Sequence, residues 1–203
     1  MIERSTIPTG DEIPPPRARE GTTVRGVAEF EWLDDQQQRD WRRYLLGSLM
    51  LTERLDRDLR QRHDLSLAEY EVLVRLSEAD DRSLRMAELA EFSNQSRSRL
   101  SHTVDRLQKD GLVVRDHCDV DRRGVWARLT DTGFARLEEA AYTHVAGVRE
   151  YLVETVGPTD FTALGRAFQA VVDRLSGGDP AAERCIEAGS TSPSTPVRSA
   201  AVS

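Results

Sequence analysis

The stretch from Ser96 to Gly133 constrains the fold of this chain more than any other. Between Ser96 and Lys109, apolar residues recur at steps of three and four, the period of an amphipathic helix: Leu100, Val104 and Leu107. The opposite face carries small polar groups, arginine and histidine: Arg97, Ser98, Ser101, His102 and Asp105. The pattern predicts a helix with one buried face and one polar face.

Two β-like runs follow this helix. Gly111 stands where a helix end favours a left-handed residue. The runs Leu112–Arg115 and Val125–Leu129 come next, joined by the charged turn DHCDVDRRG. Thr130 is placed to cap a further helix. The sequence therefore predicts a two-stranded hairpin with arginines at its tip.

A second short helix precedes the first. Met86–Glu91 is expected to be helical, with Met86, Leu89 and Ala90 facing inward, and Phe92–Gln95 to be a tight turn. Two short helices joined by a small polar turn are typical of a helix-turn-helix. With the hairpin behind it, the predicted unit is a winged helix-turn-helix.

Long helices are expected on both sides of this unit. The first, Asp35–Arg62, has a stripe at helical spacing, formed by Trp41, Tyr44, Leu45, Ser48, Leu51, Leu55 and Leu59. A capping box at Ser66 and Glu69 starts the next helix, Ser66–Ser77, and a loop is expected at Glu78–Ser83. After the hairpin, helices are predicted over Asp131–Thr155 and from Thr159 to Leu175, separated by Gly157 and Pro158.

The predicted fold class is mainly α with a small β-wing. Residues 1–30, rich in proline, glycine and charge, and residues 177–203, of low complexity, are expected to be disordered. Residues 66–130 form the expected winged helix-turn-helix domain, and 31–65 with 131–176 a helical dimerisation region. In that region, Trp32 and Trp41 either anchor a second subunit or fill the core of the monomer.

Charge is unevenly distributed along the chain. The whole chain carries −7, but the span from Arg82 to Leu129 holds ten arginine and lysine residues against seven acidic ones, so it is +3 and the rest is −10. A basic face on an acidic body can attract and orient DNA. No apolar run approaches the ~18 residues of a membrane span. The first residues lack the apolar core of a secretory signal, so we expect a cytoplasmic protein without membrane partners.

The chain resembles the MarR family, the multiple antibiotic resistance regulators, over residues 36–175. The segment DVDRRGVWARLTDTG is similar to the wing pattern of the family, and SRLSHTVDRLQKDGLVVR resembles its recognition helix. The resemblance implies a homodimer on a pseudo-palindromic double-stranded DNA operator, with the long N-terminal helix and the two C-terminal helices at the interface. It also implies a repressor released by a small amphipathic or aromatic ligand. The N-terminal extension, and His102 where arginine is frequent, depart from common members.

The expected DNA contacts come from the helix and the hairpin tip. Backbone N–H groups at a helix start suit a phosphate, the arginine fork matches the guanine edge, and a narrow minor groove attracts arginine. Asp121 would hold a tip arginine in place. The alternatives are that Arg99 is solvated or forms an intradomain ion pair, and that the turn is a solvated charged loop. The expected DNA-binding residues are Gln95, Ser96, Arg97, Ser98, Arg99, Ser101, His102, Asp121, Arg122 and Arg123.

An effector cleft is expected between the first helix, the second helix and the helix after the wing. Its expected lining is Trp41, Tyr44, His63 and Tyr70, with Arg43 nearby, although each of these side chains also suits core or surface.

The sequence also leaves alternatives to a ligand-released DNA regulator. Cys118 lies beside His117, Arg115 and Arg122, which favour a thiolate, and beside aspartates that oppose it, so a redox sensor stays an alternative. His117, Cys118, Asp119 and His144 are metal-ligand types, but their spacing matches no strong zinc pattern. A winged helix that binds protein instead of DNA is a further alternative. The chain has no Gly-rich phosphate loop, nucleophile elbow or His-Glu-x-x-His motif, so we expect no enzyme, catalytic residue, cofactor or metal site.

Overall fold

The computed structural model describes residues 32–93, 95–117 and 124–177. The predicted disorder of 1–30 and the greater part of the 177–203 tail lies outside these residues, as does the hairpin tip. The chain divides into two units, residues 1–42 and residues 43–203. Helix α1 (Asp35–His63) begins in the first unit and continues in the second. It starts with reciprocal hydrogen bonds: Gln37 N–H donates to Asp34 Oδ1 over 2.7 Å, and Asp34 N–H donates to Gln37 Oε1 over 2.9 Å.

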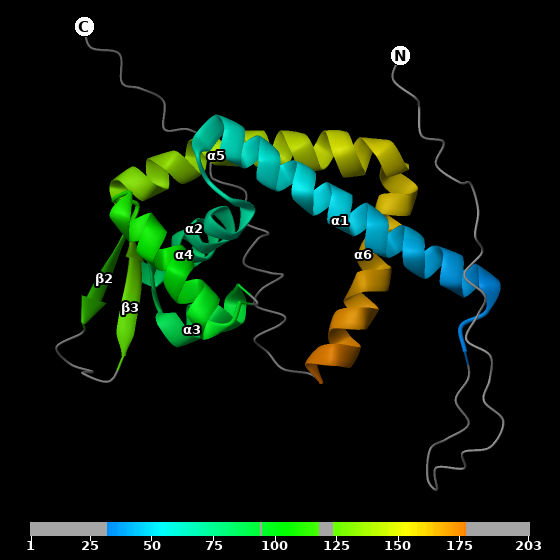
Figure 1. Cartoon of the computed structure of the whole chain (residues 1–203), viewed down its shortest axis with the longest axis horizontal. Helices are drawn as coiled ribbons and strands as arrows, with labels where there is room; N and C mark the ends of the chain where they lie inside the picture. The colour runs from blue at the N-terminus through cyan, green and yellow to red at the C-terminus, as the bar shows by residue number, and fades with distance from the viewer. Residues whose placement is uncertain (1–31, 94, 118–123, 178–203) are drawn as a thin grey trace, which may run out of the picture. The chain divides into compact units, whose positions relative to one another are not determined.

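The remaining elements follow the predicted order closely (Figure 1). They are α2 (Leu67–Glu78), the 3₁₀ turn η1 (Asp80–Arg82), β1 (Ser83–Arg85), α3 (Met86–Phe92), α4 (Arg97–Lys109), β2 (Val113–His117), β3 (Val125–Leu129), α5 (Asp131–Val148), the π-helical turn η2 (Arg149–Val153) and α6 (Glu154–Ser176). The predicted mainly-α class with a small β-wing is confirmed. No helix in the described ranges is long and apolar enough to span a membrane.

Local capping signals in the sequence form as expected. Ser66 and Glu69 make the complete capping box of α2, and Thr130 Oγ1 accepts the Gly133 N–H of α5 over 2.9 Å. Gly111 ends α4 with φ +73°, a left-handed conformation that favours glycine. The three caps fix where α2 and α5 begin and where α4 ends.

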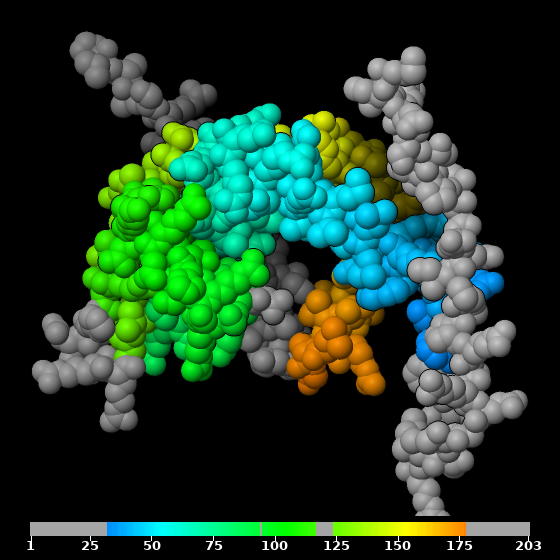
Figure 2. Space-filling view, in the orientation of Figure 1, coloured from blue at the N-terminus to red at the C-terminus, as the bar shows by residue number. Residues whose placement is uncertain are grey.

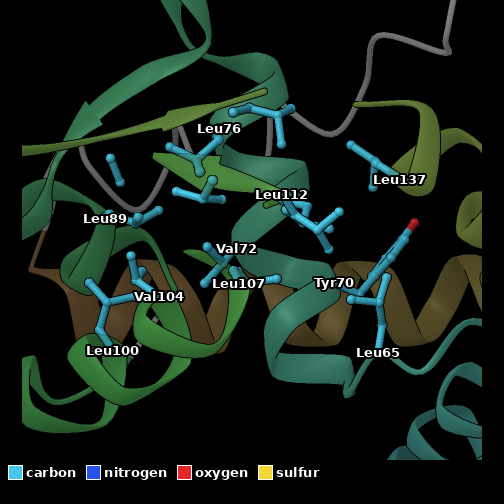
Figure 3. Close-up of a cluster of buried hydrophobic side chains, with 14 of the residues drawn as sticks. Leu65, Tyr70, Val72, Leu76, Leu89, Leu100, Val104, Leu107, Leu112 and Leu137 are labelled. Carbon is cyan, nitrogen blue, oxygen red and sulfur yellow. The ribbon is translucent and has the colours of Figure 1, made fainter. Parts of the chain in front are cut away.

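The core lies within the second unit and is built from leucine and valine on several elements. Figure 3 shows these side chains pointing toward one another from α2, α3, α4, the segment before β2, and α5. The predicted inner stripe of α4, made of Leu100, Val104 and Leu107, has no exposed area at all. Met86 lies partly buried against this cluster, next to the buried Leu89 and Ala90.

The sheet has three antiparallel strands in the order β1-β3-β2. Strand β3 is central: Ala127 pairs with Leu84 on one side and with Arg115 on the other. The predicted two-stranded hairpin is confirmed by the antiparallel pairing of β2 with β3. The third strand, β1, was not predicted, and the expected loop over Glu78–Ser83 holds the 3₁₀ turn η1 and the first residue of β1. A strand of three residues shows no period in the sequence, and β1 exists because its backbone pairs with β3, more than forty residues away.

The long helices on either side of the winged helix-turn-helix also differ from the predicted pattern. The helix expected over Asp131–Thr155 changes to π geometry at Arg149–Val153, and the expected break is present at Gly157, with φ +80°. On α5, His144 is half-buried, whereas the neighbouring Val145 is 53% exposed. On α1, Leu55 and Leu59 are buried, but Leu45 is 45% exposed.

Trp32 and Trp41 are more than half exposed, so the alternative that they fill the core of the monomer was wrong.

Candidate nucleic-acid interface

Helix α4 presents the predicted polar face to solvent. Ser96 caps the helix, its Oγ accepting the Arg99 N–H over 3.3 Å. The side chains of this face that are exposed are Ser96, Arg97, Ser98, Arg99 and His102. In Figure 2, the green part of the chain that includes α4 forms part of the visible surface. A helix of 13 residues with a buried apolar side thus carries a row of hydrogen-bonding groups on the outside.

Arg99 also has an acidic neighbour inside the domain. Burial raises the pKa of the Glu71 carboxyl on α2, while the positive charges of Arg75 and Arg99 act to lower it. Arg99 is exposed, and its charge acts on Glu71 at a distance; the intradomain ion pair expected as an alternative for Arg99 stays a prediction.

Two residues of the polar face are held by the wing. Arg115 of β2 forms an ion pair with Asp105 and donates from Nη2 to the Ser101 backbone oxygen over 2.9 Å. The same nitrogen lies 3.4 Å from Ser101 Oγ. Ser101 is half-buried under this guanidinium, which ties the outer face of α4 to strand β2.

Gln95 sits before α4 with its amide turned toward the helix. Its Oε1 accepts from Thr103 Oγ1 over 3.2 Å, while its Nε2 is buried and has no hydrogen-bond partner among the described residues. Gln95 also lines an open depression of about 420 Å³ between α3 and the start of α4, with Ala87, Ala90, Glu91, Ser96 and Arg97. One of the two polar atoms of its amide therefore has a hydrogen-bond partner inside the domain, and the side chain is half-buried instead of extending into solvent.

The predicted site residues at the hairpin tip are not among those that the structure describes. Asp121, Arg122, Arg123 and the redox candidate Cys118 lie outside the described residues. At the base of the hairpin, Arg128 of β3 pairs with Asp116 of β2 over 3.1 Å.

The four expected effector residues have different neighbours. Tyr70 is buried on α2 with its ring 4.6 Å from that of His144, and His63 Nε2 lies 2.7 Å from Thr143 Oγ1. His63 and Tyr70 thus both meet adjacent positions of α5. Tyr44 instead packs its ring 5.5 Å from that of Phe168 on α6. Trp41 belongs to the first unit.

Burial shifts the pKa values of Tyr70, His144 and His63. It raises the pKa of the Tyr70 phenol to about 12, with Glu78 adding to the shift. Burial lowers the pKa of His144, whose Nδ1 has no hydrogen-bond partner within the described part of the chain. Burial also lowers the pKa of His63; Glu139 opposes this shift, and Arg136 and Arg62 reinforce it. The sequence did not indicate that His144 packs against Tyr70, because this is a tertiary contact between α5 and α2.

Metal-ligand geometry is absent from the described ranges. No three histidine, cysteine, aspartate or glutamate side chains there are placed to hold a metal ion. Cys118 and Asp119 of the predicted metal alternative lie outside those ranges.

Comparison with known proteins gives one consistent family. Residues 63–124 match the family model described as MarR family. AbsC, a MarR family transcriptional regulator from Streptomyces coelicolor, is 39% identical in its crystal structure, with a TM-score of 0.68 over 73% of this chain and 99% of AbsC. Sco3205, from the same organism and family and crystallised in complex with DNA, is also 39% identical, with a TM-score of 0.69 over 72% of this chain and 92% of Sco3205.

A curated relative agrees over a shorter region. The HTH-type transcriptional repressor YetL of Bacillus subtilis is 34% identical over 84 residues, which are 41% of this chain and 50% of YetL. The match thus spans half the length of that protein. The similarity to AbsC and Sco3205 covers nearly the full length of both proteins, and a sequence identity of 39% over that length shows common family membership. The chain belongs to the MarR family of winged-helix transcriptional regulators, which are not enzymes.

Proposed function

We propose that the protein is a homodimeric repressor that binds a pseudo-palindromic double-stranded DNA operator in the cytoplasm and leaves it when a small amphipathic or aromatic molecule binds. The single observation that carries the DNA-binding proposal is the division of α4. Its inner residues have no exposed area, while its outer face offers arginine, serine and histidine to solvent. The DNA complex of Sco3205, 39% identical to this chain, supports the same role.

The residues of α4 have separate roles in this proposal. Arg97 and His102 reach base edges in the major groove, where an arginine fork matches guanine O6 and N7. Ser96 and Ser98 lie at the helix start, where backbone N–H groups favour a phosphate. Arg99 contacts the DNA, and its positive charge also acts on the Glu71 carboxyl. Gln95 and Ser101, which have partners inside the domain, act mainly by holding the helix.

The wing arginines complete the DNA contact. Arg122 and Arg123 enter the minor groove or meet phosphates, and Asp121 orients one of them. This part of the proposal rests on the sequence of the hairpin tip.

A second copy of the chain would cover a large apolar surface of the second unit. Groups of large exposed apolar side chains mark interaction sites on soluble proteins. Exposed apolar side chains lie on two helices: Tyr44, Leu45, Leu46, Leu49 and Met50 of α1, and Val156, Phe161, Phe168, Val171 and Leu175 of α6. The pairing of α1 and α6 between subunits follows the arrangement that the family resemblance implies.

The effector is proposed to bind near the carboxyl end of α1, where His63 and Tyr70 contact Thr143 and His144 of α5. These side chains combine apolar rings with hydrogen-bonding atoms, which suits an aromatic molecule with a polar group. Trp41 and Tyr44 are a second candidate location. A thermal-shift screen with phenolic acids, purines and antibiotics tests this, because a ligand of the native state raises the melting temperature.

The central test is a gel-shift titration with the intergenic DNA upstream of the protein's own coding sequence. Specific binding that survives competitor DNA, with a two-fold symmetric footprint, supports the proposal. Absence of binding at any salt concentration contradicts it and favours a winged helix that binds protein. Sedimentation of the wild type and of Leu49→Glu tests the dimer. The charge should give a monomer, while Gln61→Glu, at an exposed polar position of the same helix, should leave the dimer intact.

A further inference from the structure

One arginine of the recognition helix contacts the corner between α1 and α2. Arg106 Nε lies 3.0 Å from Glu69 Oε1. Its Nη2 lies 3.5 Å from Asp64 Oδ1 and 3.4 Å from the Asp64 backbone oxygen. A single guanidinium thus joins α4 to the last turn before α2 and to the first turn of α2.

The carboxylate that Arg106 meets is buried and fully occupied. Glu69 is 4% exposed, and its Oε2 accepts from the Ser66 N–H and from Ser66 Oγ, both over 2.7 Å. Arg106 supplies the partner of the other oxygen. A buried carboxylate that loses its cation is strongly unfavourable, so the ion pair holds α4 in one place relative to α2.

The corner itself is tightly constrained. Asp64 has φ +54°, a left-handed conformation that is uncommon for a residue other than glycine. Arg136 of α5 donates to the His63 backbone oxygen over 2.8 Å, and the Leu67 N–H donates to Asp56 Oδ1 over 2.8 Å. Arg106 therefore connects the recognition helix to a fixed point at the end of α1.

We propose that Arg106 is a positioning residue that sets the half-site spacing accepted by the dimer. This inference rests on the proposed function, in which α1 lies at the subunit interface and α4 enters the major groove. Two recognition helices must lie about 34–36 Å apart to meet successive major grooves. Because Arg106 fixes α4 to the end of α1, a change in this link alters where each α4 lies relative to the dimer.

A direct contact between Arg106 and a DNA phosphate is the main competing role, since the side chain is 45% exposed. The two roles predict opposite effects of Glu69→Gln. If Arg106 bound a phosphate, removal of a nearby negative charge would maintain or raise affinity. If Arg106 positions α4, Glu69→Gln weakens operator binding as removal of Arg106 does.

The test measures affinity by fluorescence anisotropy on palindromic operators whose half-sites are moved apart or together by one and two base pairs. We compare the wild type with Arg106→Gln, Arg106→Lys, Glu69→Gln and the Arg106→Gln/Glu69→Gln double variant. At the preferred spacing we expect roughly tenfold weaker binding for Arg106→Gln and Glu69→Gln, no further loss in the double variant, and a flatter spacing profile in all three. Arg106→Lys should restore part of the preference.

Salt dependence and a matched variant separate this role from the others. Loss of a phosphate contact lowers the slope of log affinity against log salt by about one unit, whereas loss of positioning leaves it unchanged. Arg97→Ala, in the proposed base-reading face, should weaken binding and keep the spacing preference. All variants are measured well below their melting temperatures, and if Glu69→Gln does not fold, the two Arg106 variants still decide the matter.

The outcomes distinguish failure of the positioning role from failure of the proposed function. An unchanged spacing profile for Arg106→Gln, or a salt slope reduced by about one unit, overturns the positioning role. Binding by the wild type to no operator at all contradicts the proposed function instead.

Discussion

The hydroxyl of Tyr151 donates a hydrogen bond to the buried carboxylate of Asp58 over 2.9 Å, and so joins the π-helical turn η2 to α1. Arg54 completes the group: its Nε lies 3.2 Å from Asp58 Oδ2, its Nη2 donates to the Tyr151 hydroxyl over 3.1 Å, and its guanidinium lies 5.0 Å from the centre of the Tyr151 ring. The contact stands where α5 changes helical geometry, so it fixes the direction of the chain into α6.

Tyr151→Phe removes this hydrogen bond while retaining the ring. The free energy of unfolding should fall by about 1–2 kcal/mol, because the bond has a charged acceptor that is left with fewer partners. Urea denaturation measures the change. The matched control is Tyr142→Phe, at a residue 80% exposed on α5, which should leave stability unaltered. Equal effects of the two substitutions would contradict the role of the Asp58 contact.

Gly133→Ala should destabilise the protein by roughly 2 kcal/mol or more, because the added carbon overpacks the first turn of α5. A Cβ at this position would lie 2.1 Å from the Leu112 backbone oxygen and 2.7 Å from Leu129 Cδ1. Gly165→Ala is the control within α6, where a Cβ meets nothing within 4 Å. That substitution should stabilise by about 0.5–1 kcal/mol, because alanine loses less conformational entropy than glycine in a helix. Thermal unfolding of both variants checks the opposite signs.

His144→Leu should reduce the acid sensitivity of folding. Burial lowers the pKa of His144 below its ordinary 6.5, so the unfolded chain takes up a proton at a higher pH than the folded one. The contribution to stability is complete above pH 6.5 and is lost as the pH falls from there through the folded pKa. Urea midpoints between pH 8 and pH 5 (roughly the range in which histidine titrates) should fall less in the variant than in the wild type. His63, with a pKa lowered mainly by burial, retains part of the dependence in both. Identical pH profiles would argue against this role of His144.

Arg123→Ala should weaken operator binding and lower the salt slope by about one unit, as expected for one lost phosphate contact at the wing tip. Arg57→Ala is the matched control, since Arg57 is exposed on α1 and pairs with Glu53 over 3.0 Å, away from the proposed DNA face. Anisotropy titrations over a range of salt concentrations give both slopes. A slope that does not change in Arg123→Ala contradicts the wing contact.

Local features of the sequence predicted most of the fold. The stripe of Leu100, Val104 and Leu107 was sufficient to place α4, because helical period and burial are properties of neighbouring residues. The same holds for the capping box of Ser66 and Glu69 and for Gly111 at the end of α4. The polar face of α4 followed from that stripe, so the exposed part of the candidate site was also predictable.

Contacts between distant segments decided the rest. Strand β1 forms because it pairs with β3, and Ser101 and Gln95 are drawn into the domain by Arg115 and Thr103. The ion pair of Arg106 with Glu69 joins residues 37 positions apart in the chain, and no spacing rule in the sequence connects them. The sequence by itself determined which face of α4 is polar, where α2 and α5 begin and where α4 ends, since those depend on residues a few positions apart. Only the tertiary structure determined which polar groups remain available and which hold the helix in place, because the pairing of buried charges depends on how the chain folds back on itself.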